Sequence, residues 1–259
     1  MELLIKPETV LDFYRDLPRL ETERLVLRKA EMRDAPSIFA FASDSDVTRY
    51  LRWGPHKDLN QTVDYLEGML AESVAGRDGS WVLSLKQTQT VIGQIHLMEI
   101  DVVDRKAQVG FVLAKEHWNQ GLATEALREV LRYAFEHLGL NRVEALCGWP
   151  ATDAGFAGVE GSVGAGSKPA LPETGKRPSV GAGLPGSSED HGINSRPAPT
   201  PRAIASTGEG INWAAIRVLE KAGMKKEGEL RQYAFQKGEF WDFWIYAVVS
   251  EDYGIIRGG

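Results

Sequence analysis

Residues Ala107 to Leu138 read AQVGFVLAKEHWNQGLATEALREVLRYAFEHL, and this stretch decides the fold. Apolar residues alternate with small or polar ones from Gln108 to Leu113, which predicts a β-strand. From Leu122 onward, apolar residues recur with a helical period and charged residues lie between them. Gly139 follows the last apolar residue, where a helix commonly stops. The stretch therefore predicts a strand, a tight turn and an amphipathic helix.

The turn between these two elements runs from Trp118 to Thr124. Gly121 and Ala123 place almost no side chain there, so a ligand can approach the backbone closely. The first amides of a helix lack partners within it and carry the positive end of its dipole. They therefore suit an anionic group such as a pyrophosphate. A plain tight turn, with small residues for packing, is the alternative explanation of the same spacing.

Apolar runs in the rest of the chain predict an α/β fold. Helices are expected to begin near Asp34, which can cap the first of them, and near Leu59. Strands are expected at residues 24–29, 81–85, 91–100, 143–148, 230–235 and 240–249, the last two joined by a hairpin turn. A strand-rich middle followed by strand, helix and strand predicts a mixed, mostly antiparallel sheet flanked by helices, with a right-handed crossover.

Composition limits the classes of protein to which this chain can belong. Its 259 residues are 43% hydrophobic and carry a formal net charge of -6, which supplies a core and argues against a nucleic-acid surface. Cys147 is the only cysteine, so neither an internal disulfide nor a cysteine-rich metal site is expected. No apolar run approaches the roughly 20 residues of a membrane span, and no signal peptide is evident. We expect a cytoplasmic monomer or homodimer that binds no metal, membrane or nucleic acid.

One segment departs from the composition of a folded domain. Residues 151–210 hold 12 Gly and 7 Pro, and Phe156 is their only aromatic residue. Such a segment cannot bury enough apolar surface to offset the loss of chain entropy, so we expect a disordered, low-complexity insert. The expected organisation is an N-terminal extension at residues 1–18 and one domain at residues 19–259, which the insert at residues 150–210 interrupts.

Three motifs resemble the GNAT superfamily of acetyl-CoA-dependent N-acetyltransferases, and they occur in the chain in the same order as in that family. The central one, Trp118-x-x-Gly121-x-Ala123, is similar to the family's motif A, although the family has Gln or Arg where this chain has Trp118. Together with Thr22–Arg28 and Asn212–Met224, it resembles the branch that contains the ribosomal-protein alanine and serine N-acetyltransferases. The resemblance covers most of the chain outside the expected insert and implies the GNAT fold.

This resemblance also implies where the ligands bind. Acetyl-CoA would be the cosubstrate, with its pyrophosphate on the turn before the helix and its pantetheine arm along the preceding strand. The cofactor-binding residues would be Phe111, Val112, Leu113, Asn119, Gln120, Gly121, Leu122, Ala123, Thr124 and Asn212. Trp53 and His56 would shape the acceptor site. Glu125 would repel a phosphate that it faced, so its side chain is expected to point away.

The resemblance says less about catalysis. Relatives often carry a Glu, a Ser or a Tyr where this chain has Gln108, Ala215 and Leu219, and none of these three residues can titrate. Glu99 is our candidate catalytic residue, which could take a proton through water. His96 lies on the same expected strand, and an odd spacing places it on the opposite face from Glu99. Many enzymes of this kind work chiefly by positioning their reactants, so the missing groups do not exclude activity.

The sequence thus predicts an N-acetyltransferase that moves an acetyl group from acetyl-CoA to a primary amine. The branch resemblance favours a protein N-terminal α-amine as the acceptor, and a small amine such as a polyamine or an amino sugar is the other possibility. A non-catalytic acetyl-CoA-binding or interaction protein is the alternative, because the acid and base residues of relatives are missing. A third possibility, a nucleotide-dependent enzyme, lacks the Lys of a P-loop.

Overall fold

The computed structural model describes residues 7–75, 79–151 and 210–257. The strands are β1 (Leu20–Glu21), β2 (Leu25–Lys29), β3 (Ser80–Leu85), β4 (Val91–Asp101), β5 (Lys106–Leu113), β6 (Arg142–Pro150), β7 (Lys225–Gln236) and β8 (Glu239–Val249). The helices are α1 (Pro7–Arg15), α2 (Ala35–Ala42), α3 (Ser45–Thr48), α4 (Leu59–Val74), α5 (Leu122–Glu136), α6 (Trp213–Lys221) and α7 (Ser250–Arg257), with short 3-10 turns η1 (Met32–Asp34) and η2 (Lys115–His117). None of these helices is long and apolar enough to cross a membrane.

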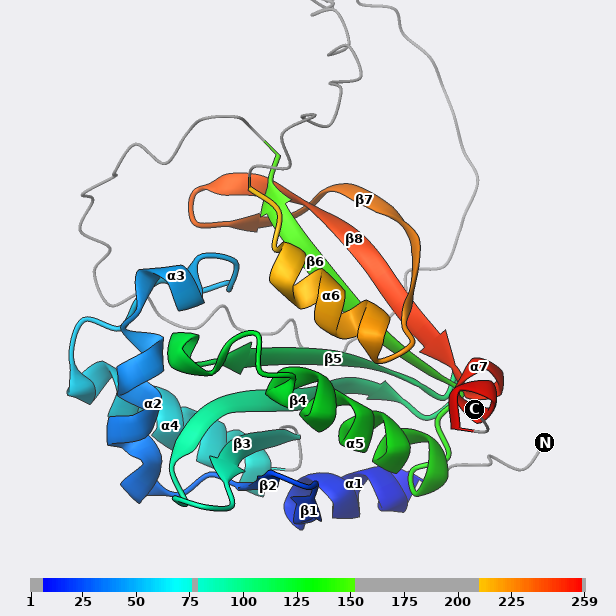
Figure 1. Cartoon of the computed structure of the whole chain (residues 1–259), viewed down its shortest axis with the longest axis horizontal. Helices are drawn as coiled ribbons and strands as arrows, with labels where there is room; N and C mark the ends of the chain where they lie inside the picture. Colours follow the sequence, from blue (N-terminus) through cyan, green and yellow to red (C-terminus); the bar gives the residue numbers. More distant parts are fainter. Residues whose placement is uncertain (1–6, 76–78, 152–209, 258–259) are drawn as a thin grey trace, which may run out of the picture. The chain divides into compact units, whose positions relative to one another are not determined.

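The strands form one eight-stranded sheet in the order β1-β2-β3-β4-β5-β6-β8-β7 (Figure 1). β5 and β6 run parallel, and every other neighbouring pair is antiparallel. The predicted mixed, mostly antiparallel sheet is therefore confirmed. Apart from its two ends, the expected insert at residues 150–210 lies outside the described residues.

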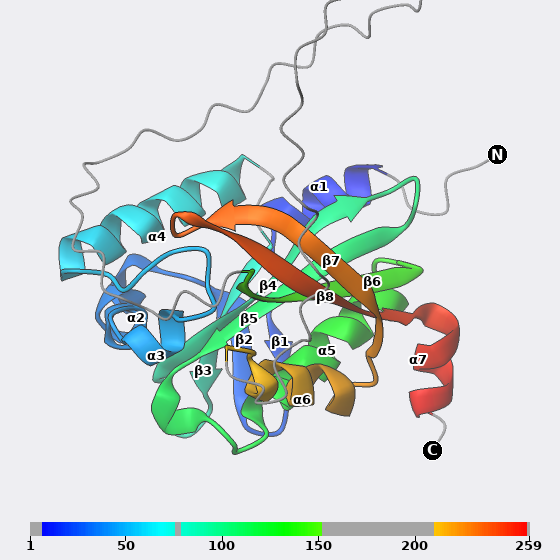
Figure 2. The same cartoon turned by 90° about the horizontal axis from the view of Figure 1, so that it is seen from above.

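Helices cover the sheet on both faces. α5 and α6 lie on one face, and α2 and α4 lie on the other (Figure 1 and Figure 2). The predicted alternation along β5 explains how one strand serves both layers: Val109 and Leu113 are buried with residues of α5 and α6, whereas Val112 is buried with those of α2 and α4. α5 ends as expected, because Gly139 has a φ of 68° in the left-handed region that terminates many helices.

Helix α1 contributes to the core. Phe13 of α1 is buried, and the centroid of its ring lies 5.6 Å from that of Trp81 and 5.8 Å from that of Tyr133 on α5. The indole nitrogen of Trp81 donates a hydrogen bond of 2.7 Å to the carbonyl of Pro18. Residues 7–18 of the expected extension therefore pack against the rest of the fold, and residues 1–6 lie outside the described residues.

β5 and β6 are paired only at their amino ends. Their register runs from Lys106 opposite Arg142 to Gln108 opposite Glu144. Beyond that point β5 stays paired with β4 and β6 with β8, so the two parallel strands separate toward their carboxyl ends. The separation leaves unpaired backbone on both strands, and the candidate functional site lies there.

Candidate functional site

A cleft of about 640 Å³ occupies the space where β5 and β6 separate. It is lined by Val109–Leu113 of β5 and Ala145–Gly148 of β6, by the turn before α5, and by α6 with the residues leading into it. Its remaining side is formed by Asp46, Val47, Arg49, Tyr50 and Leu51, which we call the α3 wall. Segments far apart in the sequence therefore enclose one cavity.

The turn before α5 offers backbone amides to this cleft. Gly121 is the N-cap of α5, with a φ of 80°, and it provides no capping side chain. The first-turn amides of Leu122, Ala123 and Thr124 are therefore not capped by that residue, and all three residues line the cleft. Together with the positive end of the helix dipole, these amides can bind an anionic group.

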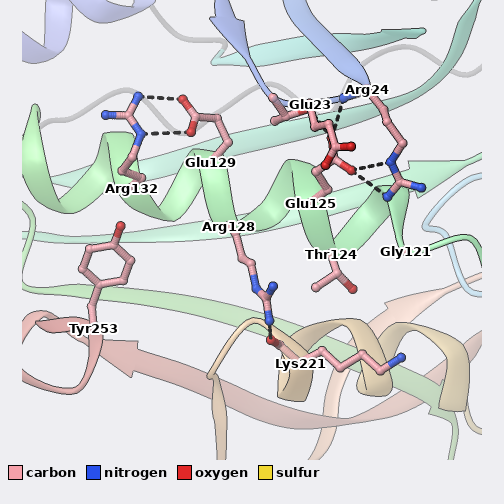
Figure 3. Close-up of a pocket in the computed structure, with 11 residues that line it drawn as sticks. Glu23, Arg24, Gly121, Thr124, Glu125, Arg128, Glu129, Arg132, Lys221 and Tyr253 are labelled. Carbon is pink, nitrogen blue, oxygen red and sulfur yellow. Dashed lines mark hydrogen bonds and ion pairs between the residues drawn. The ribbon is translucent and has the colours of Figure 1, made fainter. Parts of the chain in front are cut away.

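Arg24 braces the turn from outside the cleft. Its Nη1 donates to the carbonyl of Gln120 at 2.9 Å, and its Nη2 lies 2.6 Å from Oε2 of Glu125 (Figure 3). Glu125 also accepts hydrogen bonds from the Thr22 hydroxyl and the Arg24 amide. Burial alone would raise the pKa of Glu125, but these hydrogen bonds outweigh it and hold the pKa below its ordinary value. Glu125 does not line this cleft. It lines the second cavity described next, where Arg24 holds its carboxylate, so its direction away from a bound phosphate stays a prediction.

A second cavity of about 610 Å³ adjoins the first along α5 (Figure 3). Gly121, Thr124 and Lys221 line both cavities. The guanidinium of Arg128 donates a hydrogen bond of 2.6 Å to the carbonyl of Lys221, which joins α5 to the end of α6. Arg24 and Arg132 add further positive charge to the lining, although each is paired with a carboxylate. The second cavity thus continues the anion-binding turn past four cationic side chains, beside which lie the carboxylates of Glu23, Glu125 and Glu129.

Most of the predicted cofactor residues surround the cleft. The exception is Gln120, whose side-chain nitrogen donates to the carbonyl of Glu116 at 2.8 Å instead. Asn212 lines the cleft and also caps α6, because its Oδ1 accepts a hydrogen bond of 3.0 Å from the amide of Ala215. This cap leaves the side-chain amide nitrogen of Asn212 as a donor. The others that line the cleft are Phe111, Val112, Leu113, Asn119, Gly121, Leu122, Ala123 and Thr124.

The structure places the two expected acceptor residues elsewhere. Trp53 and His56 pack with Tyr65 of α4 in an aromatic cluster, with the rings of Trp53 and His56 4.9 Å apart, and neither residue lines the cleft. His56 is buried, and its Nδ1 lies 2.8 Å from the hydroxyl of Thr62. Burial lowers the pKa of His56. In this arrangement the cluster fixes the loop that follows α3.

Glu99 and His96 do not line the cleft either. The register of β4 against β5 shifts between Met98 and Asp101, and Glu99 has a φ of 54° at this bulge. The alternation argument used for the two residues therefore does not hold across the bulge, and Glu99 is exposed. His96 lies 2.5 Å from the hydroxyl of Ser80, and loss of hydration lowers its pKa to about 4. His96 is a neutral strand residue at physiological pH.

Ionisable residues that were not assigned to the site from the sequence also line the cleft: Asp46, Arg49, Tyr50, His117, Cys147, Arg217 and Lys221. Tyr50 belongs to the α3 wall, and its hydroxyl lies 3.4 Å from the carbonyl of Ile211. Cys147 is buried, which raises the pKa of its thiol to about 12. The thiol is therefore protonated at neutral pH and is a poor nucleophile. No periodicity in the sequence indicates these positions.

The described residues contain no cluster of His, Cys, Asp and Glu that could hold a metal ion. The titratable groups of relatives are replaced here by Gln108, Ala215 and Leu219, and the last two line the cleft. The cleft therefore combines an anion-binding helix terminus, unpaired strand backbone and a lining whose described residues include Asp46 as the single carboxylate. Such a site favours binding and orientation of a ligand.

Comparison with known proteins gives one consistent result. The family model described as the acetyltransferase (GNAT) domain matches residues 24–149. The uncharacterised N-acetyltransferase p20 of Bacillus licheniformis is 36% identical over 126 residues, which are 49% of this chain and 71% of p20. The uncharacterised N-acetyltransferase YoaA of Bacillus subtilis is 27% identical over 90% of this chain and 97% of its own length. YdaF of Bacillus subtilis, whose name assigns it provisionally to the ribosomal N-acetyltransferases, is 47% identical over 22% of this chain and 31% of its own.

Solved structures share the fold. One from Vibrio cholerae, described provisionally as a ribosomal-protein-serine acetyltransferase, has a TM-score of 0.59 at 15% identity and covers 90% of this chain and 97% of that one. The spermidine N-acetyltransferase of Vibrio cholerae, solved with CoA and spermine, has a TM-score of 0.55 at 17% identity over 88% of this chain and 97% of that one. At these identities the likeness concerns the fold.

Proposed function

Because the chain belongs to the GNAT family of acetyltransferases, we propose that acetyl-CoA occupies the cleft between β5 and β6. Its pyrophosphate would lie on the amides of residues 122–124, and its pantetheine arm would follow the unpaired backbone of Phe111–Leu113. The amide nitrogen of Asn212 would donate to that arm from α6. The observation that best supports this proposal is the N-terminus of α5. Its N-cap residue, Gly121, provides no capping side chain, and the first residues of the helix line the cleft.

The nucleotide end of acetyl-CoA would extend into the second cavity. Both cavities meet at Gly121 and Thr124, where the pyrophosphate would bind, so a ligand that fills the cleft can continue along α5. Lys221 and Arg128 would then lie beside its phosphates. This placement gives the cationic lining a role, since ammonium and guanidinium groups form strong, charge-assisted hydrogen bonds to phosphate.

We propose direct transfer of the acetyl group to a primary amine. The amine nitrogen attacks the thioester carbon, the new C–N bond forms as the C–S bond breaks, and the proton lost by the amine goes to the departing thiolate. A covalent intermediate on Cys147 is disfavoured, because the thiol is protonated in its buried position. Tyr50 and His117 line the cleft and can exchange protons with the reactants. Glu99, the candidate from the sequence, would act only through water.

A protein N-terminal α-amine is the acceptor that we favour. The branch resemblance supports it, as do the provisional names of YdaF and of the Vibrio cholerae ribosomal-protein-serine acetyltransferase neighbour. A polyamine is the second candidate, because another neighbour of the same fold is a spermidine N-acetyltransferase. Of the α3 wall's charged residues, Asp46 is the single carboxylate, and it is already 2.6 Å from Lys115. A polycationic acceptor would find little compensating charge on this side of the cleft.

The test is a competition between the two acceptor classes. Purified protein is incubated with acetyl-CoA and either peptides with free α-amines or spermidine, and products are identified by mass spectrometry. We expect acetylation at the peptide α-amine and little at spermidine. Preferential acetylation of spermidine would overturn the acceptor assignment, and no acetylation of any amine would contradict the proposed transfer.

A further inference from the structure

The end of the β7–β8 hairpin contacts the α3 wall. β7 and β8 are joined by Lys237 and Gly238, which have φ values of 52° and 85°, as a tight two-residue turn requires. The Nζ of Lys237 donates hydrogen bonds of 2.8 Å to the carbonyl of Thr48 and 2.9 Å to that of Arg49. One ammonium group thus joins segments that lie 189 and 188 residues apart in the sequence.

These two carbonyls are at the carboxyl end of α3. The Thr48 carbonyl also accepts a hydrogen bond of 3.0 Å from the amide of Leu51, and a cation is favoured at the carboxyl end of a helix. The ring of Trp241 on β8 lies 5.8 Å from Nζ of Lys237, and loss of hydration lowers the pKa of this ammonium. Lys237 is therefore fixed by the turn that carries it and by the groups that it meets.

Other contacts also hold the α3 wall: Val47 is buried with residues of α2 and α4, and Leu51 packs against the same cluster. Asp46 and Lys115 form an ion pair of 2.6 Å, but their side chains are 53% and 51% exposed, so water and salt screen the attraction. The Tyr50 hydroxyl contacts the Ile211 carbonyl at 3.4 Å, near the limit for a hydrogen bond. Lys237 makes two charge-assisted contacts, of 2.8 and 2.9 Å, and is the tether that joins the wall to the β7–β8 hairpin.

The proposed binding mode of acetyl-CoA includes no contact with the α3 wall. In the arrangement proposed above, the cosubstrate is held by the backbone of β5, the turn before α5 and Asn212. The α3 wall faces the same cavity from residues 46–51 and remains for the acceptor. A residue that fixes this wall can therefore change how the amine is seated without touching either ligand.

We propose that Lys237 is a positioning residue for the acceptor: it holds the α3 wall through the Thr48 and Arg49 carbonyls and so sets the geometry in which the amine meets the thioester. The inference rests on the proposed function of the cleft. It adds the β7–β8 hairpin, which does not line the cavity, to the elements that determine acceptor recognition.

The test is the substitution Lys237→Met in the full chain, which keeps most of the aliphatic side chain and removes the ammonium. We expect the KM for the acceptor peptide to rise about tenfold or more, because two charge-assisted hydrogen bonds are lost. The Kd for acetyl-CoA should stay within about twofold of the parent's, because the substitution changes none of the groups that are proposed to bind acetyl-CoA. Lys237→Arg, which retains a cation, should recover part of the acceptor KM.

The matched control is Lys225→Met at the other end of β7. Lys225 is exposed and forms an ion pair of 2.9 Å with Asp252, far along the strand from the turn. It should leave both constants unchanged. An unchanged acceptor KM in Lys237→Met would overturn the proposal, and so would a parallel loss of acetyl-CoA affinity and thermal stability, which would indicate a merely structural role.

A measurement independent of turnover separates this inference from the proposed function. Hydrogen exchange of the amides at residues 46–51 should accelerate in Lys237→Met and not in Lys225→Met. If exchange accelerates but the parent protein acetylates no amine, the tether is present and the proposed function has failed. If exchange is unchanged, the tether itself is refuted, whatever the activity.

Discussion

Arg24 and Glu125 join the approach to β2 to the first turn of α5, with Nη2 of Arg24 2.6 Å from Oε2 of Glu125. The contact turns the one carboxylate of that first helical turn away from the cleft, and it leaves Arg24 free to hold the Gln120 carbonyl with Nη1. The anion-binding turn is thus supported by a strand on its outer side. Such support keeps the amides in place before a ligand arrives.

This pair should make stability depend on pH. The pKa of Glu125 is lowered in the folded protein, so its contribution is present above the ordinary carboxyl pKa and is lost as pH falls through the folded value. Glu125→Gln should cost about 1 kcal/mol of unfolding free energy at pH 7, because the ion pair is partly exposed, and the difference should shrink in acid. Urea unfolding at both pH values measures it. Glu23→Gln, an exposed neighbour, is the control, and a gap that widens in acid would contradict the assignment.

Cys147 should be dispensable for chemistry. Its thiol is protonated, with a pKa of about 12, so Cys147→Ala should retain kcat within a few-fold and the parent should react slowly with iodoacetamide at neutral pH. Intact-mass spectrometry during turnover should show no acetylated protein. An acetyl group on Cys147, with activity lost in the alanine variant, would replace direct transfer by a covalent mechanism.

Two buried glutamines should respond in opposite ways to the same substitution. Neither side-chain polar atom of Gln236 has a hydrogen-bond partner, whereas Gln94 accepts from the Tyr65 hydroxyl at 3.2 Å. An unpaired buried polar group costs stability, so Gln236→Leu should leave the Tm unchanged or raise it. Gln94→Leu should lower stability by about 1–3 kcal/mol. A fall in Tm for Gln236→Leu as large as that for Gln94→Leu would show that Gln236 has a partner.

Lys221 should recognise the phosphate at the nucleotide end of acetyl-CoA. Removing its charge in Lys221→Met should weaken acetyl-CoA binding by about three- to tenfold, as expected for one charge-assisted contact. The same variant should bind 3′-dephospho-acetyl-CoA as well as the parent protein does. Calorimetry measures the Kd of each ligand, with Lys225→Met as the control. If Lys221→Met weakened the binding of both ligands equally, the 3′-phosphate would have to bind elsewhere.

Periodicity predicted the elements that carry the cofactor side of the site. The alternation from Gln108 to Leu113 and the helical period after Leu122 are local signals, and burial on both faces of the sheet enforces them. Asn212 likewise caps α6 from its place just before a helical run, where Asn is a favoured N-cap residue. Residues of this kind can be assigned from sequence because their neighbours in the chain determine their structure.

The acceptor side could not be predicted in the same way. Lys237 meets Thr48 across 189 residues, and Tyr50 meets Ile211 across 161, so no local pattern indicates either contact. Counting along a regular strand put Glu99 and His96 on opposite faces, and one bulge in β4 invalidates the count. A single extra residue changes the face of a side chain without any clear signal in composition.

The most direct test of the central claim is calorimetric titration of the purified protein with acetyl-CoA, ATP and NAD, repeated with Gly121→Asp. Gly121 has a φ of 80°, so Gly121→Ala reports the cost of backbone strain alone, and the aspartate adds a negative charge where the pyrophosphate would bind. We predict selective binding of acetyl-CoA, weaker binding in Gly121→Ala and loss of binding in Gly121→Asp, with both variants folded by circular dichroism. Binding of acetyl-CoA that Gly121→Asp leaves intact, or no binding by the parent protein, would contradict the account.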